Sequence, residues 1–224
     1  MAAYLLSGLE RLKQFIRHSV LHVLIGRLTI MRKLLLTVIS LNGILAAINL
    51  GMAQNWVPLT NVPGGLWSGA LSADGTKLIL GSVNSGSVFT STNSGATWMT
   101  NNITSVPYPF WTSVASSADG IKLVAANGHP GQGLIYSSTN AGAAWMTNNV
   151  TSELWQSIVS SADGTKLVAV IADGPIFTST NSGQDWNSFN NSINTYYFSV
   201  ASSADGKKLA AVGGINGNQQ LYLS

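Results

Sequence analysis

The stretch "STNSGATW", residues 91–98, occurs in three related forms, with "STNAGAAW" at 138–145 and "STNSGQDW" at 179–186. Ser, Asn, Gly and Trp keep their places in all three. Ser and Asn side chains hydrogen-bond the backbone of tight turns, Gly takes the positive φ, and Trp fills the space between packed sheets. The stretch therefore predicts a turn between two strands that recurs in each copy of a larger unit.

A second phrase, Ala-Asp-Gly, marks four copies of that unit. Its aspartates are Asp74, Asp119, Asp163 and Asp205. A repeat of about 40–45 residues with several short strands is typical of a propeller blade. An aromatic residue precedes each Asp by seven or eight positions, and we expect Trp67, Trp111, Trp155 and Tyr197 to be equivalent.

Each unit is predicted to contain four strands, here called A to D. Strand A ends in Ser-Ser, as in 112–116, and a tight Ala-Asp-Gly turn leads into strand B, the Lys-Leu-Val-Ala run. Strand C is "GLIYSS" or "GPIFTS", and strand D, "WMTNN", follows the first phrase. Short strands, dense turn residues and the lack of helical periodicity indicate an all-β fold. We expect the lysine of each Ala-Asp-Gly phrase to be solvated.

The first phrase resembles the Asp-box, or BNR, repeat of sialidase-like β-propellers, Ser-x-Asp-x-Gly-x-x-Trp, within the wider group of WD40- and YVTN-type propellers. Asn replaces Asp in every copy and keeps the acceptor oxygen. The resemblance covers residues 56–224 and implies a structural role for the box, on the face opposite the ligand site. The matching residues are Ser91, Asn93, Gly95, Trp98, Ser138, Asn140, Gly142, Trp145, Ser179, Asn181, Gly183 and Trp186.

The strand count predicts about four four-stranded blades. "NWVPLTN", which begins at Asn55, reads as a strand D, and "LYLS" at the end of the sequence reads as a strand C. We expect the N-terminal strand to complete the last blade and close the ring, which would remove exposed sheet edges. The alternative is a truncated fragment of a larger propeller.

The N-terminal region reads as a targeting segment. Residues 31–53 have the charged start, apolar run and small-residue end of a signal peptide, with cleavage expected after Ala53. Residues 1–30 are then an extension upstream of the true start, Met31. The alternative is an uncleaved anchor over 34–53. In either case the propeller, 54–224, is predicted to be secreted, periplasmic or on the cell surface.

Charge and composition exclude several functions. The pI is about 9.3, but most of the 11 Lys and Arg residues lie in the first 33 residues, and acids outnumber bases after residue 53. A nucleic-acid partner is therefore not expected. Without Cys, and with His129 as the only His after residue 53, we expect no metal site and no cofactor.

The resemblance to sialidases implies a glycosidase, but the residues oppose one. Sialidases bind the substrate carboxylate through three arginines, and every Arg here lies at or before Arg32. Apart from the turn aspartates and Asp185, the acids after residue 53 are Glu153 and Asp173. We therefore predict no enzymatic activity. A degenerate glycoside-hydrolase relative that uses these two acids remains the alternative.

The loops between strands D and A supply the candidate binding site, because uncharged aromatic side chains there can stack on sugars or contact a protein. The loop between strands B and C that holds His129 is expected on the same face. We predict a non-catalytic binding or scaffold domain for carbohydrate or protein; an assembly factor is a further alternative. For the recurring aromatic positions, packing between blades is the competing interpretation. The candidate ligand-binding residues are Tyr108, Phe110, Trp111, Trp155, Tyr196, Tyr197 and His129.

Overall fold

The computed structural model describes residues 58–103, 109–189, 195–215 and 218–224. Residues Leu59–Ser224 form one compact unit. Its strands are β1 (Leu66–Leu71), β2 (Leu78–Ser82), β3 (Val88–Ser91), β4 (Met99–Asn101), β5 (Trp111–Ser116), β6 (Leu123–Asn127), β7 (Ile135–Ser138), β8 (Met146–Thr147), β9 (Trp155–Ser160), β10 (Leu167–Ile171), β11 (Ile176–Ser179), β12 (Asn187–Phe189), β13 (Tyr196–Ser202), β14 (Leu209–Ile215) and β15 (Asn218–Leu223).

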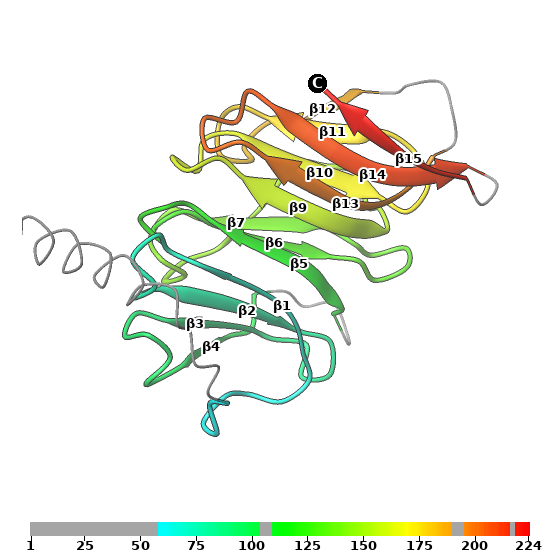
Figure 1. Cartoon of the computed structure of the whole chain (residues 1–224). Coiled ribbons are helices and arrows are strands. Elements are labelled where there is room, and N and C mark those ends of the chain that lie inside the picture. The colour runs from blue at the N-terminus through cyan, green and yellow to red at the C-terminus, as the bar shows by residue number, and fades with distance from the viewer. Residues whose placement is uncertain (1–57, 104–108, 190–194, 216–217) are drawn as a thin grey trace, which may run out of the picture. The chain divides into compact units, whose positions relative to one another are not determined.

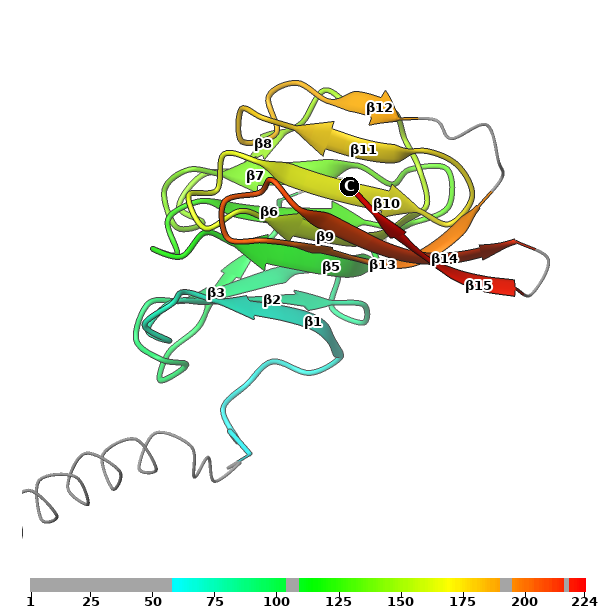
Figure 2. The ribbon, with the colours of Figure 1, turned by 45° about the horizontal axis from the view of Figure 1, so that its top comes forward.

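These strands form four antiparallel sheets in chain order, which confirms the all-β propeller fold. The first three sheets, β1–β4, β5–β8 and β9–β12, have four strands, and the fourth has β13–β15. We call the sheets blades 1 to 4. Figure 1 shows them stacked face to face in sequence order, and Figure 2 shows the same row from another angle. The described residues contain no helix that could span a membrane.

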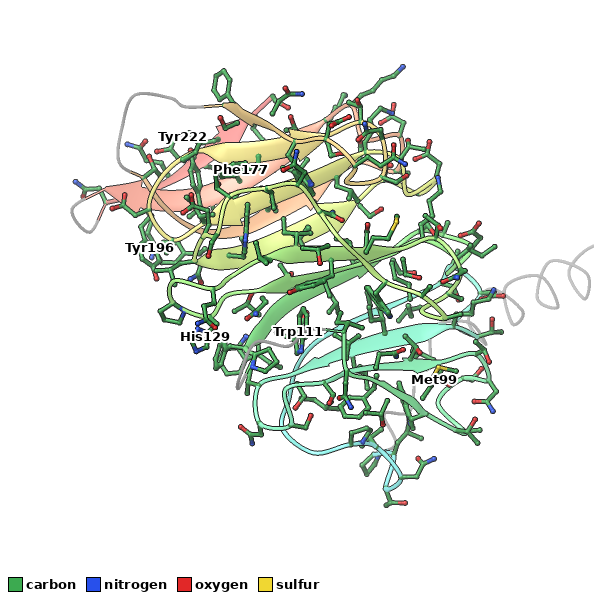
Figure 3. The ribbon with its side chains drawn as sticks, turned by 180° about the vertical axis from the view of Figure 1, so that it is seen from behind. Met99, Trp111, His129, Phe177, Tyr196 and Tyr222 are labelled. Carbon is green, nitrogen blue, oxygen red and sulfur yellow. The ribbon has the colours of Figure 1, made fainter. Side chains whose placement is uncertain are left out.

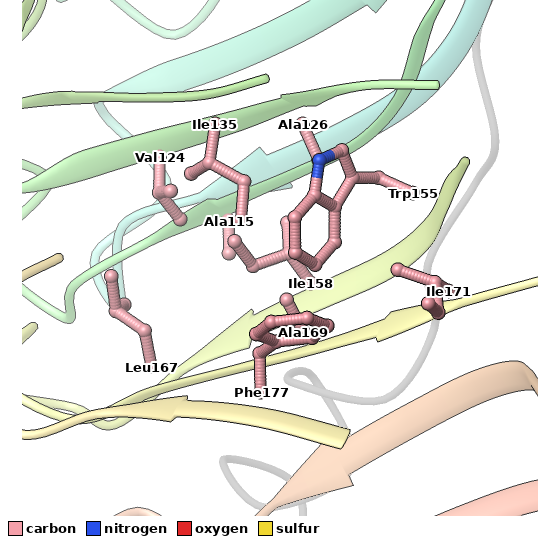
Figure 4. Close-up of a cluster of buried hydrophobic side chains, with 10 residues drawn as sticks. All are labelled: Ala115, Val124, Ala126, Ile135, Trp155, Ile158, Leu167, Ala169, Ile171 and Phe177. Atoms are coloured by element: carbon pink, nitrogen blue, oxygen red, sulfur yellow. The ribbon is translucent and has the colours of Figure 1, made fainter. Parts of the chain in front are cut away.

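The hydrophobic core lies between blades. Alternate residues of a strand point to opposite faces of its sheet, so β6 packs Leu123 and Ala125 against blade 1, and Val124 and Ala126 against blade 3. All of β6 is buried for this reason. Figure 4 shows the cluster between blades 2 and 3, which includes Trp155. A third cluster joins blades 3 and 4.

The box turns have the expected structural role. In the first copy, the Asn93 side-chain oxygen accepts the Thr97 N–H at 2.9 Å, and the Ser91 hydroxyl oxygen accepts the Gly95 N–H at 3.0 Å. Gly95 has a φ of +82°, and Ser94 before it is also left-handed, at +56°. Two successive left-handed residues reverse the chain within the box, so this turn sets where the last strand of the blade, β4, begins.

In two of the three boxes, the Asn forms a hydrogen bond that Asp cannot form. Besides accepting the backbone N–H, its amide group donates a hydrogen bond in two copies, from Asn93 to the Thr97 hydroxyl and from Asn181 to the Asp185 carboxylate, each at 2.8 Å. A carboxylate would have no proton to donate and would repel Asp185. The departure from Asp is therefore part of the turn's hydrogen bonding in these two copies.

The predicted strand at the N-terminus does not complete blade 4 in the described part of the chain. Residues 55–57 lie outside the described residues, and Leu59–Asn61 form no strand. The Asn61 side chain instead donates to the backbone oxygens of Gly95 and Ala96 in blade 1, at 3.2 and 2.9 Å. The described end of this segment thus contacts blade 1's own box turn, and closure of blade 4 by residues 55–57 lies outside the described residues.

Candidate functional site

The same β-bulge occurs near the start of the first strand of each blade, which we call the inner strand. These strands are β1, β5, β9 and β13. In blade 2, Trp111 pairs with Asn127 and Ser113 pairs with Ala126, so Thr112 is the extra residue. The residues at the bulge are Trp67, Thr112, Gln156 and Phe198. A bulge reverses which face a side chain takes. Leu66, not Trp67, is therefore the equivalent of Trp111, and the sequence-based equivalence of Trp67 was wrong.

Three of the candidate ligand-binding residues are core residues. Trp111 and Trp155 have no exposed surface, and Tyr197 is 1% exposed. The Trp155 indole N–H donates to the Gly133 oxygen at 3.1 Å, and its ring meets Phe177 edge-on at 4.9 Å. A surface ligand cannot reach these rings, so their assignment as binding residues is corrected to packing between blades.

The other aromatic candidates lie on the edge where the inner strands begin, which we call the rim. Phe110 and Tyr196 are partly exposed, and Tyr108 lies outside the described residues. Trp67, at 66% exposed, has its ring centre 6.0 Å from that of Phe110, and Phe198 lies 5.1 Å from Tyr196. Figure 3 shows His129 and Tyr196 on one side of the molecule and Met99 on the other.

A buried asparagine positions two rim residues. Asn127, at the end of β6, has no exposed surface, and its side-chain oxygen accepts the backbone N–H groups of Phe110 and His129, each at 3.0 Å. The His129 ring nitrogen Nδ1 lies 3.0 Å from the Pro130 oxygen. Asn127 was not predicted from the sequence, because an Asn at the end of an apolar strand resembles an ordinary loop residue.

The charges of the propeller are divided between the two ends of the strands. The rim carries Glu153, on the loop between blades 2 and 3, and Asp173, on a loop within blade 3. All five lysines after residue 58 lie in the Ala-Asp-Gly turns at the opposite end. The described residues form no group of three or more His, Asp and Glu side chains that could hold a metal. The rim is thus aromatic and weakly acidic.

The aspartates of the Ala-Asp-Gly turns are engaged in the turns themselves. The Ser72 hydroxyl donates to Asp74 at 2.6 Å, and the Thr76 N–H and hydroxyl donate to the same carboxylate oxygen. These hydrogen bonds lower the pKa of Asp74 to about 2. The equivalent serine is the main cause of a lowered pKa at Asp119, Asp163 and Asp205. Carboxylates held ionised in this way are poor proton donors.

A cavity of about 370 Å³ between blades 3 and 4 was not anticipated. Box tryptophans pack against the first two core clusters, Trp145 between blades 1 and 2 and Trp186 between blades 2 and 3. The described part of the third cluster has no tryptophan. Apolar side chains line the cavity, among them Phe189, Tyr197 and Tyr222.

Comparison with known proteins supports the fold. No family model matches the chain, and no curated sequence does. Among solved structures, YCF48 bound to D1 peptide matches with a TM-score of 0.55 and 14% identity over 76% of this chain and 60% of that one. The GH74 enzyme of Niastella koreensis matches with a TM-score of 0.53 and 20% identity, over 73% of this chain and 23% of that one.

A third match, from a nidogen/laminin complex, has a TM-score of 0.53 and 13% identity, and covers 70% of this chain and 64% of the other. The chain thus spans about 60% of the YCF48 structures it matches. These proteins include an enzyme and peptide- or protein-bound propellers, and at such low identity the likeness concerns the fold alone. The chain is similar to a run of blades within these structures, and its fold is that of a β-propeller.

Proposed function

We propose that this chain is an exported, non-catalytic propeller of the Asp-box type that binds a peptide segment of a protein partner on its rim. The observation that carries the proposal is the set of exposed aromatic rings at the rim, held in place by the blades beneath them. Trp67 and Phe110 form one pair and Tyr196 and Phe198 form another. Exposed rings on a rigid support are typical of protein-binding surfaces.

The chemistry of the rim favours a ligand that is apolar and basic. Glu153 and Asp173 are its charged residues, and no Lys or Arg lies there. A peptide with aromatic or aliphatic residues beside Lys or Arg would match both the rings and the carboxylates. YCF48 bound to D1 peptide and the nidogen/laminin complex are precedents for protein ligands on a similar fold.

The non-catalytic part of the proposal rests on the acids and arginines. The turn aspartates are held ionised by their own hydrogen bonds, and Asp185 accepts a hydrogen bond inside a box turn. Glu153 and Asp173 remain, without an arginine after residue 32 to bind a substrate carboxylate. Export rests on residues 31–53, whose charge and apolar run favour a signal peptide, with 54–224 as the exported propeller.

Selection of phage-displayed peptides on the immobilised full chain tests the rim. The expected peptides contain an aromatic or aliphatic residue next to Lys or Arg, and the double variant Trp67→Ala, Phe110→Ala loses at least tenfold in affinity for them. Met99→Ala is the matched control, because Met99 is also exposed but lies at the other side of blade 1. Peptide binding that survives the double variant contradicts the proposal. So does binding on a glycan array without selected peptides, which would favour a carbohydrate ligand.

A further inference from the structure

Adjacent blades are joined by a set of polar contacts that repeats at every junction. Between blades 1 and 2, the Ala73 N–H donates to the Ala118 oxygen at 2.7 Å, and the Lys77 ammonium donates to the Asp119 oxygen at 2.8 Å. A Cβ on Gly120 would lie 2.7 Å from that of Lys77, so only glycine leaves room for this lysine. The recurrent lysine is thus a contact between blades, which corrects the expectation that it is merely solvated.

The other two junctions are built in the same way. Ala118 donates to Ala162 and Ala162 to Ala204, each at 2.7 Å. Lys122 and Lys166 reach the backbone oxygens of Asp163 and Asp205, at 3.0 and 2.6 Å. In every case the earlier blade supplies the N–H and the ammonium group, and the later blade supplies two carbonyl oxygens and a glycine. The interface therefore has a direction along the chain.

The two ends of the row present the unmatched halves of this interface. In blade 4, the Ala204 N–H and the Lys208 ammonium have no hydrogen-bond partner among the described residues, although they occupy the donor positions. In blade 1, the Ala73 and Asp74 backbone oxygens occupy the acceptor positions and accept no hydrogen bond from a described residue. The space next to Gly75 is open, where Gly120, Gly164 and Gly206 each receive a lysine.

The apolar residues of the outer face of blade 4 follow the same pattern. Val212 pairs with Leu221, as Ala126 pairs with Ile135 in blade 2. Ala126 and Ile135 are fully buried by blade 3, whereas Val212 is 39% and Leu221 is 63% exposed. Blade 4 thus has an apolar face built for a following blade.

We infer that this face of blade 4 binds blade 1 of a second copy of the chain, head to tail. A second copy presents the required carbonyl oxygens and the open glycine at the same spacing as the three existing junctions, which argues for it over an unrelated protein. The Lys208 ammonium then donates to the Asp74 oxygen of the other copy, and the Ala204 N–H donates to its Ala73 oxygen. Two such contacts join two copies into an eight-bladed ring, within the range known for propellers.

Light scattering after size-exclusion chromatography tests this inference on the full chain in a non-ionic detergent. The native protein is expected to have twice the mass that is measured for the denatured single chain. Leu221→Asp places a carboxylate in the contact and shifts the protein to monomer, whereas Met146→Asp, at a comparably exposed site on β8, leaves the dimer intact. Circular dichroism confirms that both variants keep their sheets.

A pair of lysine variants gives a second measurement that does not depend on Leu221. Lys208→Met removes the proposed hydrogen bond from both contacts of the ring and raises the dimer dissociation constant by about ten- to a hundredfold. Lys207→Met removes the neighbouring charge from a position that is not part of the repeated contact, and leaves the constant unchanged. A monomer at all concentrations overturns the inference. A dimer that neither Leu221→Asp nor Lys208→Met weakens also overturns it, because the contact then lies elsewhere.

Discussion

Removal of the Trp155 ring is predicted to destabilise the propeller strongly. The side chain has no exposed surface and packs between blades 2 and 3 against Phe177. Burial of a tryptophan removes about 200 Å² from water, which at about 25 cal/mol per Å² is worth about 5 kcal/mol. Since the neighbours relax only in part around the cavity, we expect Trp155→Ala to lower the free energy of unfolding by about 3–5 kcal/mol.

The contribution of the indole N–H can be separated from that of the ring. Trp155→Phe keeps most of the ring but leaves the Gly133 oxygen without its donor, at a cost of about 1–3 kcal/mol. Trp67→Ala is the control, because Trp67 is largely exposed at the bulge, and it should cost about 0.5 kcal/mol.

Urea unfolding followed by far-ultraviolet circular dichroism measures these differences without depending on tryptophan fluorescence. With a slope of about 2 kcal/mol per molar urea, the midpoint of Trp155→Ala falls by about 1.5–2.5 M. A cost below about 1 kcal/mol for Trp155→Ala, or one equal to that of Trp67→Ala, would refute the reasoning. Trp155 would then be no part of the core and would return as a ligand-binding candidate.

Three further predictions concern the turns. Because the pKa of Asp74 is lowered, its carboxylate stabilises the fold above the unfolded pKa of about 4 and loses this effect as the pH falls toward 2. The urea midpoint should therefore be flat from pH 6 to about pH 4.5 and should fall below that. A midpoint that rises on acidification contradicts this prediction. Gly142→Ala, at a φ of +90° with a threonine methyl 2.9 Å from the new Cβ, should lower the melting temperature more than Gly131→Ala, where φ is +73° but the space is open; equal losses would show that backbone strain alone matters. Asn181→Asp, which places two carboxylates 2.8 Å apart, should lower the melting temperature at pH 7 more than Asn140→Asp, and equal effects would contradict the donor role of the Asn amide.

The repeat made the fold predictable, but one of its aromatic residues, Trp67, was aligned wrongly. The Asp-box-like phrase and the Ala-Asp-Gly turns correctly predicted strands, turns and blade order. Trp67 was grouped with Trp111 as an aromatic residue, but it precedes its Asp by seven positions, whereas Trp111 precedes its Asp by eight. Leu66, eight positions before Asp74, holds the place of Trp111 in the register. An offset of one residue in a strand moves a side chain to the other face, so this difference in spacing decides which residue packs between blades.

The candidate site was predictable only in part, for a related reason. Phe110 and Tyr196 are exposed on the rim as expected, while Trp111, Trp155 and Tyr197 are core residues. Recurrence in every blade was the signal that separates the two groups, because packing between blades recurs and a ligand contact need not. The contacts between the Ala-Asp-Gly turns could not be read from the sequence, since backbone groups form them and every residue has such groups.

The hydrogen bonds between blades, which all run from the earlier blade to the later one, also affect how the protein unfolds. Each blade is held by its immediate neighbours, so cooperativity passes along the row from one blade to the next, as in a linear chain of coupled units. In a single copy, blade 2 has a neighbour on both sides and β6 is wholly buried, whereas blade 4 shares one face and keeps Leu221 and Leu223 in solvent. Opening therefore begins by fraying at an outer blade and moves inward, and amide protons exchange more slowly in β6 than in β14.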